Sequence, residues 1–107
     1  FPKLRFGFLE AGIEWTTRLV KALGNKNRAK IDRWLAERVF VSCALDDDLP
    51  YVAGKLGDDF IVTATDFPHG DAFRQDQLAN GLKARGDLSA QTMEKILSKN
   101  PQRLYHL

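Results

Sequence analysis

Cysteine and histidine are scarce in this 107-residue chain, which contains one cysteine and two histidines. A lone Cys43 excludes an internal disulfide framework and is typical of a reducing compartment, so we expect a cytoplasmic protein. Any metal or acid–base site must draw much of its ligand set from outside these three residues. The sequence has no apolar run of membrane-spanning length and no N-terminal signal pattern, so we expect no membrane partner. The chain starts with Phe1 rather than methionine, so we expect the true start to lie upstream.

An excess of one sign of charge is also lacking, because the formal net charge of the whole chain is only +2. Its distribution is uneven, since residues 18–38 carry seven basic side chains and two acidic ones. A basic helical segment can bind phosphates, but a solvated outer helix face has the same composition. No recognised nucleic-acid motif accompanies these residues, so we expect no nucleic-acid partner. A self-standing α/β binding module with this basic surface is kept as an alternative function.

Apolar runs alternate with helical periodicity along the whole chain. Runs at 4–9, 40–45 and 60–65 predict strands, the last two buried, and helices are predicted at 13–23, after 27, at 49–57, at 75–85 and after 89. This order predicts parallel strands joined by helical crossovers, with open edges that need more sheet beside them. Three units of a TIM (β/α)8 barrel occupy about 94 residues. We therefore predict that residues 1–107 form a partial α/β domain, about three βα units of such a barrel.

Local signals predict where several helices begin and which side chains pack. The acidic triplet 46–48 precedes a helix and is predicted to cap its N-terminus, where acids are favourable. It lacks the ligand spacing of a calcium loop, so we prefer capping to calcium binding. Ser89 is predicted to cap the last helix, and Pro101 to start a short final turn. Trp15 and Trp34 stand at helical spacing and are predicted to be packing anchors.

The most informative stretch is the strand-like run 60–65 that ends in Asp66-Phe-Pro-His69. It places a carboxylate at the C-terminal tip of a buried strand, where α/β folds carry their chemistry. On the residues alone, a carboxylate that caps the turn into Pro68 is the simpler interpretation. Residues 1–15, 65–69 and 96–105, taken in this order, resemble the last third of an amidohydrolase-related barrel. The branch most similar is that of the metal-dependent hydrolases and decarboxylases that resemble aminocarboxymuconate-semialdehyde decarboxylase.

The resemblance implies a fold and a set of site residues. The three strands would be strands six to eight of the barrel, and Asp66 would match the Asp that closes strand eight, sits at the metal and handles a proton of the water or substrate. Glu10 follows strand six, where decarboxylases of this branch commonly present a histidine. It would serve as a general base or a metal ligand, or else only bond neighbouring backbone. His69 belongs to the Asp-x-Pro-His signature and is a candidate substrate contact.

The resemblance also implies partners that this chain lacks. The family's His-x-His pair on strand one and its histidine on strand five have no counterpart here, so the divalent metal, with zinc expected, needs the missing N-terminal part of the barrel. We therefore expect a metal-dependent hydrolase or decarboxylase acting on a small carbon–nitrogen, ester or carboxylate substrate. The isolated chain is expected to be inactive. A catalytically silent relative and a homo-oligomeric assembly both stay open.

Overall fold

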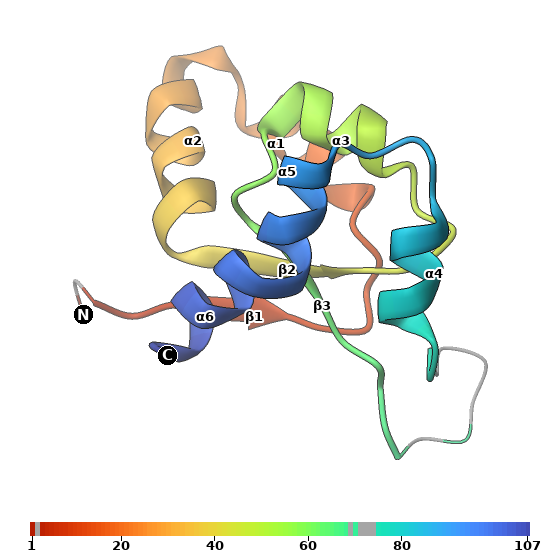
Figure 1. Cartoon of the computed structure of the whole chain (residues 1–107). Helices are drawn as coiled ribbons and strands as arrows, with labels where there is room; N and C mark the ends of the chain where they lie inside the picture. The colour runs from red at the N-terminus through yellow and green to blue at the C-terminus, as the bar shows by residue number, and fades with distance from the viewer. Residues whose placement is uncertain (2, 69, 71–74) are drawn as a thin grey trace.

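The computed structural model describes residues 1, 3–68, 70 and 75–107. Within them, three parallel strands form one sheet in the order β1-β2-β3. The strands are β1 (Phe6–Phe8), β2 (Val39–Cys43) and β3 (Ile61–Thr63), and helices follow each of them (Figure 1). Parallel strands adjacent in sequence and joined by helices are the arrangement that the alternating pattern predicts.

The described helices fill the two connections between the strands and the C-terminal region. Between β1 and β2 lie α1 (Trp15–Leu23), the short 3-10 turn η1 (Asn25–Asn27) and α2 (Arg28–Glu37), and between β2 and β3 lies α3 (Leu49–Leu56). After β3 come α4 (Leu78–Ala84), α5 (Ala90–Glu94), the π-helical segment η2 (Lys95–Lys99) and α6 (Asn100–Tyr105). Among these described helices, none is both long and apolar enough to cross a membrane.

The core lies between one face of the sheet and the helices. Val41, Cys43 and Ile61 share this face and are at most 2% exposed. They pack against buried side chains of the helices and loops, which include Ile13, Val20, Ile31, Leu35, Leu49, Val52, Leu78 and Ile96. Burying one such aliphatic side chain stabilises a fold by roughly 1.5–3 kcal/mol. The side chains at alternate positions, Phe40 and Ser42, point to the opposite face of the sheet.

Helix boundaries follow local chemistry. Gly24 and Gly57 end α1 and α3 with φ angles of 76° and 80°, a backbone conformation that favours glycine. The Asp48 carboxylate accepts a hydrogen bond from the Tyr51 amide (3.1 Å), and the Ser89 hydroxyl accepts one from the Thr92 amide (3.0 Å). The predicted caps at both helices are therefore confirmed.

One local prediction is wrong, and one more is confirmed. Trp34 is 43% exposed, and Lys30 Nζ lies over its ring, 4.8 Å from the centroid, so this tryptophan is not a packing anchor. The short final turn predicted from Pro101 is found as α6, which carries Pro101 in its first turn and follows η2 directly. The backbone N–H of Asn100 donates to Lys95 O, five residues back, as in a π-helix. This wider turn adapts the helix to Pro101, which has no backbone N–H to donate.

Candidate functional site

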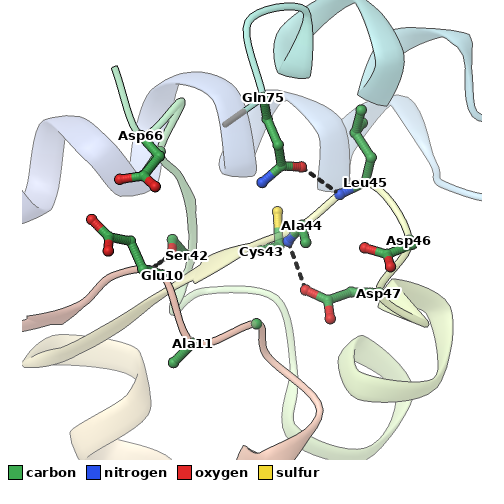
Figure 2. A pocket seen from close by; sticks show the side chains of 12 residues that line it. Glu10, Ala11, Ser42, Cys43, Ala44, Leu45, Asp46, Asp47, Asp66 and Gln75 are labelled. Carbon is green, nitrogen blue, oxygen red and sulfur yellow. Dashed lines mark hydrogen bonds between the residues drawn. The ribbon is translucent and has the colours of Figure 1, made fainter. Parts of the chain in front are cut away.

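A pocket of about 570 Å³ lies where the parallel strands end. Its wall is built from the residues that follow β1, from the end of β2 and the loop after it, and from the residues that follow β3 (Figure 2). The polar side chains that line it are those of Glu10, Ser42, Cys43, Asp46, Asp47, Asp66 and Gln75. The carboxyl ends of parallel strands are where α/β folds gather reactive side chains.

Glu10 and Asp66 come from the two outer strands and meet in this pocket. Figure 2 shows their carboxylates pointing toward one another across its mouth. Both residues have a left-handed backbone, with φ of 63° at Glu10 and 59° at Asp66. This conformation is uncommon outside glycine, asparagine and aspartate, and costs roughly 1 kcal/mol or more. The structure thus places together the two carboxylates that the sequence singles out.

Neighbouring groups position the backbone of Glu10 and shield the Asp66 carboxylate from solvent. The Glu10 amide donates to the Oγ of Ser42, a buried residue of β2 (3.2 Å). Asp66 is half-buried, and its Oδ2 is shielded from solvent. A carboxylate at a rigid strand end, partly removed from water, is suited to exchange a proton with a bound molecule.

Asp47 and Cys43 line the inner wall. Asp47 Oδ2 accepts a hydrogen bond from the Ala44 amide (2.6 Å), so this acid shapes the loop after β2 while Asp48 caps α3. Burial raises the pKa of the Asp47 carboxyl. Burial, followed by the nearby Asp47 charge, raises the pKa of the Cys43 thiol to about 12. Cys43 is therefore a neutral thiol at physiological pH and is not an activated nucleophile.

Gln75 connects the segments that follow β2 and β3. Its side-chain Oε1 accepts a hydrogen bond from the Leu45 backbone amide (2.8 Å), and its backbone N–H donates to Thr65 O (3.0 Å). Arg85 braces the same rim by donating to the carbonyls of Leu45 (2.8 Å) and Asp47 (2.9 Å). Sequence reasoning missed Gln75 because no local pattern marks it, and it missed Asp47 because the acidic triplet was assigned to capping as a whole.

The donor set of the described residues does not complete a metal site. No group of three His, Cys, Asp or Glu side chains there is arranged to hold a metal ion. Catalytic zinc takes three protein ligands and an open position, whereas the pocket mouth offers the oxygens of Glu10 and Asp66. His69, the predicted substrate contact, lies outside the described residues. We therefore derive no reaction step through a metal.

Adjacent parallel strands, each followed by helices, with acids gathered beyond the carboxyl ends of the strands, define a parallel α/β fold. Among solved structures, the chain is similar to the crystal structure of an amidohydrolase from Mycobacterium avium subsp. paratuberculosis K-10, with a TM-score of 0.71 and 27% sequence identity. The match covers 96% of this chain and 28% of that amidohydrolase. No protein-family model matches the chain, and no curated protein does.

The comparison supports a relationship to the amidohydrolases and does not assign a branch within them. The chain spans well under a third of the length of that amidohydrolase, so it corresponds to a segment of such a fold. A segment of three adjacent parallel strands agrees with the predicted part of a TIM barrel.

Proposed function

We propose that this chain is the C-terminal segment, strands six to eight, of an amidohydrolase-type barrel that hydrolyses a small amide or ester. The observation that carries the proposal is the pairing of Glu10 and Asp66, two carboxylates from different strand ends that line one pocket. The similarity to an amidohydrolase over nearly the whole chain supports the same conclusion.

Asp66 acts in this proposal as the general base. Its carboxylate takes a proton from the attacking water and returns it to the leaving group. Glu10 lies across the mouth, where it orients the water or assists the proton transfer, and the Ser42 hydroxyl holds its backbone in position. His69 is proposed to contact the substrate.

A divalent metal, with zinc expected, belongs to the same proposal, with Asp66 as this chain's ligand. When bound, the metal would polarise the substrate carbonyl and acidify a water molecule. The other ligands would come from outside the described residues. A decarboxylase is the second reaction class that we propose for a pocket lined by two carboxylates. We also propose a cytoplasmic location for the protein.

The edge of β1 is proposed as the junction with the remaining barrel. Phe6 and Phe8 are 51% and 44% exposed, and Leu9 beside them is 48% exposed. Parallel sheets are normally covered on both faces and paired at their edges. A preceding strand that pairs with β1 would cover these side chains, so the isolated chain is expected to lack activity.

The test uses the full-length protein and a panel of 4-nitrophenyl esters and 4-nitroanilides. We expect hydrolysis that a chelator abolishes and added zinc restores. Asp66→Asn should remain inactive after zinc addition, whereas Asp48→Asn should behave like the wild type because asparagine also caps a helix. Hydrolysis that survives chelation would contradict the metal-dependent assignment. A folded wild type without activity on the panel, and without bound zinc, would instead indicate a catalytically silent relative.

A further inference from the structure

A basic basin lies at the end of the sheet opposite the candidate functional site. Its residues line two adjoining pockets, the larger of about 530 Å³, and come from the N-terminal segment, the end of α2 and the C-terminal helices. The charged and titratable side chains that line them are those of Lys3, Arg5, Glu37, Arg38, Lys99, Arg103 and His106. Five of these are cations, and Glu37 is the only acidic side chain among these lining residues of the described chain.

The strand register brings two of the arginines together. Phe6 pairs with Val39 in the parallel ladder, and the Phe6 amide donates to Arg38 O (2.7 Å). Arg5 and Arg38 therefore immediately precede two neighbouring strands, and neighbouring strands lie about 4.8 Å apart. Like charges at neighbouring positions of a sheet repel each other, and an anion held between them would remove the repulsion.

In the described part of the chain, Glu37 is the one acidic side chain that lines the basin beside these two arginines. Among the described residues, no acid forms an ion pair with Arg5 or Arg38, and Arg5 donates instead to the imidazole of His106. Both arginines are half-buried, which lowers the solvent screening of their charge. Arg103 is partly engaged, since its guanidinium lies 3.9 Å from an Asp59 carboxylate oxygen and 5.5 Å from the centroid of the Phe40 ring.

We propose that this basin binds a phosphate group, with Arg5 and Arg38 as the paired ligands and Lys3 and Arg103 at its rim. Two guanidinium forks side by side match the tetrahedral oxygens of phosphate better than single lysines do. The site is separate from the carboxylate pocket, because Arg5 precedes β1 whereas Glu10 follows it. The inference therefore does not depend on the proposed hydrolase function.

The test is calorimetric titration of the full-length protein with pyrophosphate at constant ionic strength. We expect saturable one-to-one binding that weakens about tenfold in Arg38→Gln and in Arg5→Gln, because each loses charge-assisted hydrogen bonds. Arg18→Gln, which removes one exposed charge from α1 outside the basin, should change the affinity less than about twofold. Equal weakening in all three variants would overturn the proposal, since it would show only general charge attraction.

A second measurement needs no substitution. Amide chemical shifts of the unaltered chain are followed during titration with orthophosphate and, separately, with glycerol 3-phosphate. Shifts centred on the amides of Phe6 and Arg38 with either compound support the site, and the stronger of the two identifies free or esterified phosphate as the ligand. Shifts spread evenly over residues 18–38, or no shifts, would overturn it.

Discussion

Asn100 is the side chain whose loss should destabilise this fold most clearly. It is fully buried, and its Nδ2 donates to Asp58 O (2.7 Å) and to Ile61 O (2.8 Å). These two bonds tie α6 to the loop before β3 and to the first residue of that strand, which leads to Asp66. In Asn100→Ala both carbonyls lose this donor, and one of the two bonds is completely buried.

The expected loss of unfolding free energy follows from these contacts. A buried polar group that loses its partner costs about 1–3 kcal/mol, and the second, part-buried bond about 1 kcal/mol. We therefore expect Asn100→Ala to lower the free energy of unfolding by about 3 kcal/mol, a large part of the total for a small domain. The assay is urea unfolding followed by circular dichroism, with an unchanged m value as the check for a comparable transition.

The matched control is Asn80→Ala in α4. Its Nδ2 donates to Gln77 Oε1 (2.9 Å) on an exposed surface, so the same substitution should change stability by less than about 0.5 kcal/mol. Asn100→Asp keeps the volume but places acceptors opposite carbonyl oxygens. It should be strongly destabilising at pH 7 and recover partly in acid, where a protonated carboxyl donates one bond. A loss below about 1 kcal/mol for Asn100→Ala would show that the two hydrogen bonds of this side chain contribute little to stability.

Three further predictions concern local groups. Ser89→Ala removes the cap on the Thr92 amide and should lower the free energy of unfolding by about 1 kcal/mol in the same urea assay. Burial would raise the pKa of Asp58, but hydrogen bonds from Lys95 and Thr92 outweigh it and hold this pKa below its ordinary value of 3.8. The stabilisation from Asp58 is therefore complete above that value and is lost as the pH falls through the lower folded pKa, so Asp58→Asn should flatten the acid limb of a stability–pH curve. Cys43, with its pKa raised to about 12, should resist iodoacetamide at pH 8 in the folded chain and react once urea unfolds it, as mass spectrometry would show. Rapid alkylation of the folded chain would contradict the buried position of this thiol.

Local features of this fold were predictable because short-range chemistry determines them. Apolar runs located β2 and β3, and the caps at Asp48 and Ser89 involve donors only three residues away. Trp34 was misjudged because helical spacing shows that residues share a stripe, not which part of the stripe faces the core. Its neighbours Ile31 and Leu35 are buried, whereas Trp34 itself lies beside the basic side chains of the outer surface.

The candidate site was predictable only in part, because it depends on contacts between distant segments. Asp66 and Glu10 were identified from motif order, yet nothing local indicates that the Glu10 amide bonds Ser42, 32 residues away. Gln75 likewise bonds the Leu45 amide across 30 residues. Sequence periodicity assigns residues to elements, whereas the parallel register decides which strand ends share a pocket.

The general-base role of Asp66 is the feature on which the proposed hydrolysis depends. It is tested most directly by the kcat of the full-length protein carrying Asp66→Asn, measured with the best substrate of the nitrophenyl panel. Loss of a general base lowers a rate by about 10²–10⁴-fold, so we predict a fall of at least about a hundredfold, with a circular dichroism spectrum like that of the wild type and an unaffected Asp48→Asn control. A folded Asp66→Asn protein that keeps kcat within about threefold of the wild type would contradict the claim.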